Sequence, residues 1–257
     1  MKVLPQAAAL DPIHQFEIKK IFPFEPFGID LAFTNSALFM LLGVVLVIGF
    51  FGFAASRAQT VPSRVQSIAE LGYGFIADMI RGVAGEEGLK FFPFVFTLFF
   101  FIFIANLIGM VPYAFTTTSH IIFTATLAVM VILLVLVYGL MKHGFNFFKL
   151  FAPAGAPLPV YILLVPIEII SFAARPLTLS LRLFANMLAG HITLKLFAGF
   201  TLMLVSAGGV YIGLAPFAFF MGVALNALEF LVAGLQAFVF AILTCVYLND
   251  ALHPGHH

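Results

Sequence analysis

The chain is poor in charge. Only 9% of its 257 residues are charged, whereas 63% are apolar. A water-soluble domain carries roughly 25% charged residues, so this composition indicates a protein embedded in lipid. Tryptophan is absent, which leaves tyrosine, lysine and arginine as anchors at the bilayer surface. Cys245 is the single cysteine, so a disulfide bond within the chain is excluded.

The sequence also lacks the motifs of common catalytic and ligand sites. It has no GxxxxGK[ST] phosphate loop, no CxxC pair and no HExxH motif, so no nucleotide or metal site and no cofactor are expected. No nucleophile–base pair stands out, which counts against an intramembrane enzyme. No internal repeat is visible, which counts against an inverted-repeat transporter. The histidines within 253–257 are interpreted as part of a solvated tail.

Three apolar stretches have the length of an ordinary membrane-spanning helix. They comprise residues 36–56, 91–111 and 120–141. Residues 63–85 are too polar to cross a bilayer, but their apolar residues recur at helical spacing. Ser63 and Gln66 fit a capping box, so this segment is predicted to be an amphipathic helix lying at the membrane surface.

Two later stretches are too long for ordinary spans. Residues 160–204 stay compatible with a helix over roughly 65 Å at about 1.5 Å per residue, and residues 211–250 repeat the problem. The hydrocarbon core is only about 30 Å thick. We therefore predict an all-α integral membrane protein with about five membrane helices and one interfacial helix. Its last two helices form a long, strongly tilted hairpin over 160–250 that turns around 207–209, after a loop at 151–159.

Basic residues set the expected orientation. Four lysines and arginines lie between the first two spans and two follow the third, whereas the link between the second and third spans has none. The positive-inside rule then puts the amphipathic helix and the C-terminus in the cytoplasm or matrix. Residues 1–35 mix charges and prolines and are interpreted as an outer tail, not a secretory signal. Residues 36–257 form a single membrane domain.

Charged groups inside the long helices need a physical reason, because each costs at least about 3 kcal/mol near the bilayer centre. Arg182 is the key one, since its guanidinium keeps its proton in proteins. At about 100° per residue, Glu168, Arg175 and Asn186 share a face with Arg182, and small residues flank that face. We interpret it as a seam against a partner helix. His191 falls on the opposite face.

The last helix carries a matching polar stripe. It comprises Asn226, Glu229, Gln236 and Tyr247. Glu229 can bind and release a proton and His191 titrates near neutral pH, so the two predict a proton relay, with Asn226 and Gln236 holding water or neighbouring side chains. Glu168 lies about 20 Å from Arg182 along the helix. The pattern predicts two half-paths separated by a fixed cation that excludes a travelling proton.

Structural interpretations of these residues remain open. An intramembrane arginine can pair with Glu168 inside a bundle, and a lone histidine such as His191 is more often a packed core residue. Glu168 and Gln236 can serve packing. Arg175 and Lys195 can extend to the membrane surface.

Several runs closely resemble subunit a of the F-type ATP synthases. These are LSLRLFANMLAGH at 179–191, PIEIISFAARP at 166–176 and LEFLVAGLQAFVFAILTCVYL at 228–248. DPIHQFEI at 11–18 and NLIGMVP at 106–112 are similar to the first segment and the second-span end of that family. The resemblance covers nearly the whole chain.

This resemblance implies proton translocation through two offset half-channels beside a rotating c-subunit ring, coupling the proton-motive force to rotary ATP synthesis. It implies that Arg182 faces the ring, that Asn186 lines the path beside it and that Gln236 lies close to the arginine. His191 and Glu229 correspond to the inlet half-channel.

The same resemblance makes Glu168 the acid on the outlet side and Tyr247 a tyrosine near that outlet. It also implies the steeply tilted helical hairpin.

The partners that the resemblance implies are the c-ring, peripheral stalk b subunits, other ATP synthase subunits and membrane lipid, without nucleic acid. ATP chemistry then belongs to other subunits, so the chain is not an enzyme by itself. A bacterial inner membrane is expected, with the mitochondrial inner membrane as the alternative. The alternative function is a proton-coupled secondary transporter. The ring site largely decides between protons and sodium ions.

Overall fold

The computed structural model describes residues 18, 20–22, 32–111, 114–144, 147 and 158–252. Its elements are, in chain order, β1 (Lys20–Phe22), β2 (Phe33–Thr34), α1 (Asn35–Ser56), α2 (Arg64–Gly88), η4 (Leu89–Phe91), α3 (Phe92–Gly109), η5 (Thr117–Ser119), α4 (Ile121–His143), α5 (Leu158–Ala207), η7 (Gly209–Leu214) and α6 (Ala215–Leu252). The two short strands pair antiparallel. Among the described residues, 5 helical segments are long and apolar enough to cross a membrane. The predicted all-α membrane fold is confirmed.

The three ordinary spans correspond to α1, α3 and α4, with ends shifted by one or two residues. α4 continues one residue past Lys142 because that side chain finds partners there. Its Nζ atom donates to Glu87 Oε2 at 2.7 Å and to the Leu252 carbonyl at 3.3 Å, which ties the end of α4 to α2 and α6. The loop expected at 151–159 lies outside the described residues, apart from its last two positions, which already belong to α5.

The capping box predicted for Ser63 and Gln66 at the start of α2 is confirmed in one of its two hydrogen bonds. Ser63 Oγ accepts from the Gln66 backbone N–H at 3.4 Å, as an N-cap does. The Gln66 side chain does not return to Ser63 but makes two 3.0 Å hydrogen bonds with the Gln59 backbone. The apolar stripe of α2 is buried at Ile76 and Ile80, whereas Ile68 is exposed. Location of this helix at the membrane surface stays a prediction.

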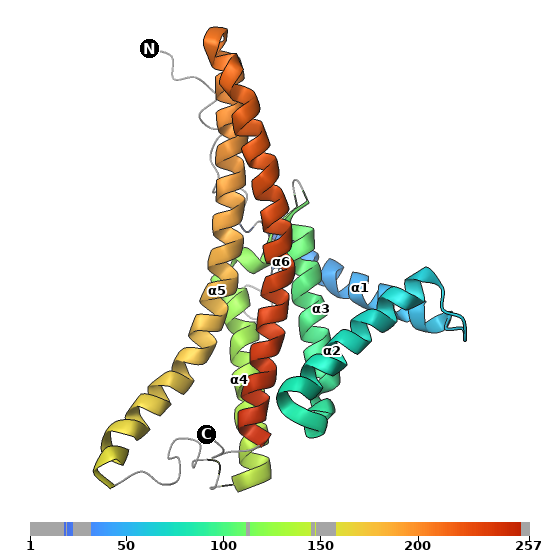
Figure 1. Cartoon of the computed structure of the whole chain (residues 1–257), viewed down its shortest axis with the longest axis vertical. Coiled ribbons are helices and arrows are strands. Elements are labelled where there is room, and N and C mark those ends of the chain that lie inside the picture. Colours follow the sequence, from blue (N-terminus) through green and yellow to red (C-terminus); the bar gives the residue numbers. More distant parts are fainter. Residues whose placement is uncertain are drawn as a thin grey trace.

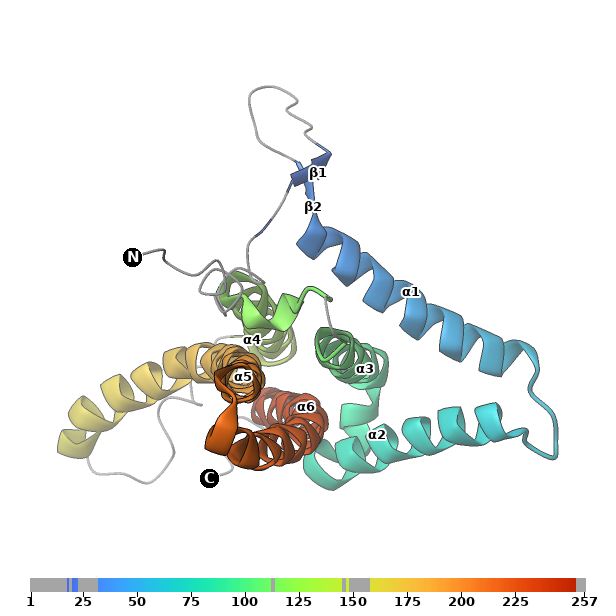
Figure 2. The ribbon, with the colours of Figure 1, turned by 90° about the horizontal axis from the view of Figure 1, so that it is seen from above.

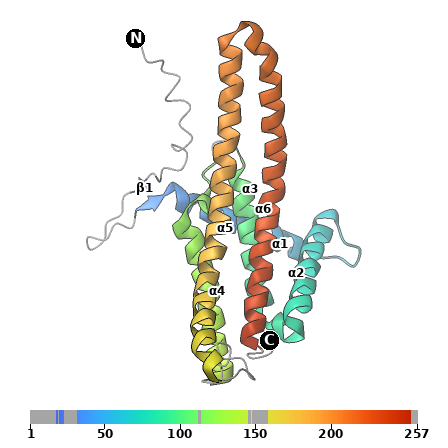
Figure 3. The ribbon, with the colours of Figure 1, turned by 60° about the vertical axis from the view of Figure 1, so that its left-hand side comes forward.

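The predicted hairpin is present. α5 and α6 run side by side and extend beyond the other helices to their turn, as Figures 1 and 3 show. Gly208 and Gly209 have φ angles of 71° and 60°, which L side chains rarely adopt, so the glycines permit the turn. The first part of α5 bends away from α6 (Figure 1), in the segment that contains Pro166 and Pro176. Tilt relative to a bilayer stays a prediction.

α6 is the central helix of the packing and contacts α2, α3, α4 and α5. Its fully buried positions include small residues one turn apart, namely Ala233, Ala237, Ala241 and Cys245. Such residues let neighbouring helices approach closely without hydrophobic help from water. Seen from above (Figure 2), α3 to α6 form one group, whereas α1 and α2 extend away to one side.

Candidate functional site

His191 and Glu229 meet between the two long helices. His191 Nδ1 lies 3.3 Å from Glu229 Oε1. The residues are only 6% and 5% exposed. An isolated buried charge is costly, so each group stabilises the charge or proton of the other. The contact joins an acid and a base that can exchange a proton.

The other ring nitrogen of His191 contacts the link between α3 and α4. Thr116 Oγ1 lies 3.1 Å from His191 Nε2 and donates to the Gly109 carbonyl at 3.3 Å. Because the single threonine proton can go to the Gly109 carbonyl or to Nε2, His191 Nε2 can either donate to Thr116 or accept from it. Nδ1 then either accepts a proton from Glu229 or donates one to its carboxylate. His191 and Glu229 therefore share one exchangeable proton.

Two amide side chains are buried near this pair. Asn106, on α3, is fully buried and its Nδ2 atom donates to the Ala233 carbonyl at 3.1 Å. Ala233 lies one helical turn after Glu229 on α6. Gln236 is also buried on α6. The polar region thus extends along α6 towards the level of Arg182.

A second polar cluster lies near the C-terminal end of α6. Arg175 Nη1 is 2.6 Å from Asp250 Oδ2, and Nη2 is 3.8 Å from Glu168 Oε1. The guanidinium carbon lies 5.0 Å from the ring centre of Tyr247 and 5.3 Å from that of Phe172, within the range of cation–π attraction. Arg175 is held by these contacts, and the extension of Arg175 or Lys195 to the membrane surface stays a prediction.

Arg182 lies between the two clusters and is exposed. It is seven residues from Arg175 and nine from His191, roughly 10 Å and 14 Å along the helix axis. Within the part of the chain that the structure describes, Arg182 makes no ion pair or hydrogen bond. Glu168 contacts Arg175 instead, so the alternative in which Glu168 neutralises Arg182 is wrong.

The exposed face around Arg182 consists of small and polar residues. Ala185, Asn186 and Ala189 follow it and are exposed, whereas Leu179 and Leu183 on the opposite side are buried in the core. A face of this kind lets a second helix come close to the guanidinium.

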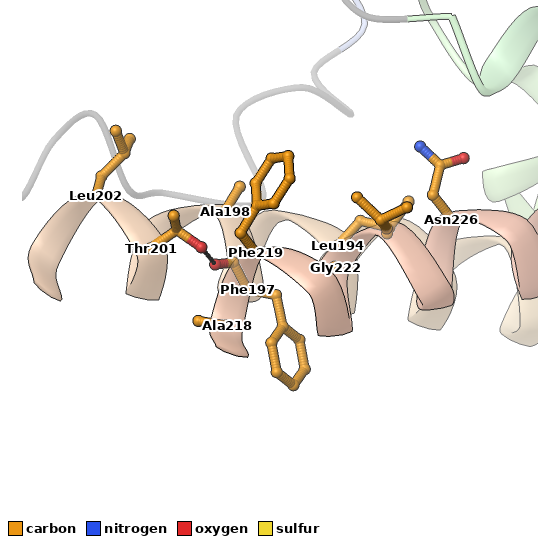
Figure 4. A pocket seen from close by; sticks show the side chains of 10 residues that line it. Leu194, Phe197, Ala198, Thr201, Leu202, Ala218, Phe219, Gly222 and Asn226 are labelled. Atoms are coloured by element: carbon orange, nitrogen blue, oxygen red, sulfur yellow. Dashed lines mark hydrogen bonds between the residues drawn. The ribbon is translucent and has the colours of Figure 1, made fainter. Parts of the chain in front are cut away.

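The polar stripe predicted on α6 divides in the structure. Glu229, Gln236 and Tyr247 are buried, but Asn226 is exposed. Asn226 lines one end of a hollow of ≈ 450 Å³ between α5 and α6, whose other lining residues are mostly apolar (Figure 4). Asn226 therefore lies on the surface side of the hairpin, apart from the buried pair.

Two residues of these clusters were missed by the sequence reasoning. Asp250 was an acid at the end of a predicted membrane helix, which is a signal that could have identified it. Thr116 belongs to a link without periodicity, and only its place in an uncharged hydroxyl-rich run, TTTS at 116–119, set it apart.

Comparison with known proteins gives one family. The family described as ATP synthase A chain matches residues 37–249. The chain is 74% identical to ATP synthase subunit a of Hyphomonas neptunium, over 98% of this chain and 99% of that protein. It is 59% identical to that of Maricaulis maris, over 97% and 100%, and 57% identical to that of Mesorhizobium japonicum, over 97% and 99%. With most of its length matched in this way, the chain belongs to the ATP synthase A chain family.

Proposed function

We propose that the chain carries protons through two half-channels, open to opposite sides of the membrane, that meet a rotating c-subunit ring at Arg182. Family membership makes the chain a non-catalytic membrane subunit of an ATP synthase, with a role in proton translocation and other ATP synthase subunits as partners. The finer proposal rests on one observation. Arg182 is exposed and unpaired within the described residues, between two separate polar clusters.

The inlet half-channel leads to His191 and Glu229. A proton from the outer side reaches their shared site and is passed to a carboxylate of a ring subunit. The 3.3 Å contact supports this step, because proton transfer needs donor and acceptor within hydrogen-bonding reach. Burial of both groups keeps the transfer apart from bulk water.

Arg182 separates inlet from outlet. Its guanidinium stays charged, so a free proton is repelled and does not pass it. A ring carboxylate that arrives opposite Arg182 is favoured in its ionised form, which forces it to release its proton. Asn186, one turn further on the same exposed face, lines this contact.

The outlet half-channel starts near Glu168 and Tyr247. These residues gather around Arg175 and Asp250 at the end of the molecule that the positive-inside rule puts in the cytoplasm. Each proton that crosses supplies about 2.3 kcal/mol per 100 mV of membrane potential. Several protons in succession can therefore drive rotation of the ring.

The partners follow from the same arrangement. The exposed small-residue face of α5 is the side for the c-ring, and the apolar outer faces of the helices lie against membrane lipid. The b subunits of the peripheral stalk are further partners. Because the relatives are bacterial proteins, we assign the chain to a bacterial plasma membrane.

Arg182→Ala tests the proposal in membrane vesicles that contain the complete ATP synthase. We expect coupled ATP synthesis to be lost, because the barrier between the half-channels is gone. Arg81→Ala is the matched control, since Arg81 is half exposed and its ion pairs within the described residues are with Asp78 and Glu86 of the same helix. Normal ATP synthesis by Arg182→Ala in vesicles that hold a proton gradient would refute the proposal. The chain alone, reconstituted without the ring, should transport nothing, unlike a secondary transporter.

A further inference from the structure

The link between α3 and α4 buries four consecutive hydroxyl side chains. Thr116, Thr117, Thr118 and Ser119 are at most 4% exposed. A buried hydroxyl group destabilises the fold when its hydrogen bonds are missing. Ser119 Oγ donates to the Thr116 carbonyl at 2.6 Å, and Thr116 Oγ1 donates to Gly109. Two of the four hydroxyl groups, those of Thr116 and Ser119, therefore have hydrogen-bond acceptors on the nearby backbone.

Buried polar atoms without a protein partner occur on both sides of Thr116. Within the described residues, no hydrogen bond is made by Thr118 Oγ1, His120 Nε2 or Asn106 Oδ1, and the Glu229 carboxylate has its 3.3 Å contact with His191 Nδ1. Groups of such atoms in a protein interior are the places where ordered water completes the hydrogen bonding. Their distribution marks a polar route through an otherwise apolar protein.

His120 lies where this route meets an open hollow. The hollow measures ≈ 430 Å³ and lies between the start of α4 and α1, with Ser36 and Met40 on the α1 side. The imidazole ring stacks on Phe115, with ring centres 4.9 Å apart and an angle of 17° between the planes. His120 is half-buried: it borders the hollow, while its Nε2 atom is buried.

We propose that this hollow is the outer mouth of the inlet half-channel, and that His120 takes up protons there and passes them by way of Thr118 and Thr116 to His191. The inference rests on the proposed function and extends it outward. Thr116 and His120 flank the single 3₁₀ turn η5, on its two sides. Thr116 then reaches His191 directly, at 3.1 Å.

The state of His120 suits this role. An imidazole has one nitrogen that can accept a proton and one that can donate a proton. No proton donor or acceptor of greater strength lines the hollow among the described residues. His120 is therefore the group that can receive a proton at the mouth and release it again.

The test is chemical rescue of His120→Ala in vesicles with the complete ATP synthase. ATP-driven proton pumping should fall about tenfold or more, as for other lost proton-transfer groups. Added imidazole, which fits the enlarged hollow and accepts protons near neutral pH, should restore pumping. Pyrazole has the same ring size but is a far weaker base and should not. Wild-type vesicles with each compound control for effects on the proton gradient.

The outcomes separate this inference from the proposed function. Normal pumping by His120→Ala, or slow pumping that imidazole does not restore, overturns the role of His120 while leaving the half-channels intact if Arg182→Ala and Glu229→Gln remain inactive. If Arg182→Ala and Glu229→Gln also pump normally, the proposed function fails as well.

If His120→Ala does not assemble, a variant with cysteine at position 120 tests the inference instead. In the Cys245→Ser background, His120→Cys should pump only at a low residual rate, which a water-soluble thiol reagent on the outer side should stop, and a normal rate or insensitivity to the reagent overturns the inference. Val210→Cys, exposed on η7, is the control that should react without loss of pumping.

Discussion

A Cβ atom on Gly190 would lie 2.8 Å from Oε1 of Glu229 and 3.1 Å from its Cδ atom. Glycine on α5 thus gives the carboxylate of α6 the room to reach His191 Nδ1 at 3.3 Å. Because the atoms approached are the end of a flexible side chain, a methyl group at position 190 would turn the carboxylate aside without separating the helices.

Gly190→Ala should therefore slow ATP-driven proton pumping strongly while the amount of assembled ATP synthase stays near normal. Gly222→Ala is the matched control on α6, because its added Cβ would meet only Phe197 Cβ at an ordinary 3.7 Å. Equal pumping rates for the two variants would show that the position of the Glu229 carboxylate does not matter.

Exchange of the pair tests whether His191 and Glu229 act as one unit. Glu229→Gln should stop pumping, because the shared proton loses its acid. The double variant His191→Glu with Glu229→His keeps an acid and a base across the same contact and should recover part of the rate. With His191→Glu and Glu229→His as the single variants of a double-mutant cycle, a coupling of about 0.5–3 kcal/mol is the range for residues in contact. Complete additivity of the single variants would argue against a shared proton.

Removal of the Thr116 hydroxyl tests the other side of His191. Thr116→Val keeps the shape but leaves His191 Nε2 without its 3.1 Å partner, so pumping should slow. Thr116→Ser, which keeps the hydroxyl, should pump near the wild-type rate. Thr97→Val serves as control, since Thr97 is exposed and its hydroxyl donates to the Pro93 carbonyl of its own helix. Like rates for Thr116→Val and Thr97→Val would exclude a role for the contact.

The ion pair between Arg175 and Asp250 should hold α5 against the C-terminal end of α6. Asp250→Asn removes the 2.6 Å ion pair and leaves the 3.8 Å contact to Glu168 as the ion pair of Arg175 within the described residues. Loss of one partner of a buried pair costs about 3–5 kcal/mol, and replacing both partners by apolar residues costs less. Because Arg175 is 18% exposed, the lower end applies. Thermal unfolding of the purified complex should show a lower melting temperature for Asp250→Asn than for Arg175→Met with Asp250→Leu, and the reverse order would contradict this assignment.

Sequence patterns predicted the long helices of this fold because each depends on local features. Apolar runs of bilayer length marked α1, α3 and α4, and uninterrupted helical sequence marked the two long helices. Two consecutive glycines, Gly208 and Gly209, marked the turn between them. Helical spacing then put His191 and Glu229 on faces that the hairpin could bring together.

The register between α5 and α6 could not be predicted in the same way. Nothing in a helical pattern states that residue 175 of one helix lies opposite residue 250 of the other, so Asp250 was missed and Arg175 was left without a partner. Thr116 was missed because a short link has no periodicity, and its contact with His191 exists only once α3, α4 and α5 pack together.

The central claim is that Arg182 stands between two water-accessible dead ends and acts on a carboxylate of a neighbouring rotor. A structure of the assembled membrane sector tests it most directly, by locating the group opposite the guanidinium. The account predicts a carboxylate-bearing helix of a ring subunit there, against the face that carries Asn186. An Arg182 side chain that points into lipid, or binds an acid of its own chain with no such helix opposite, would contradict it.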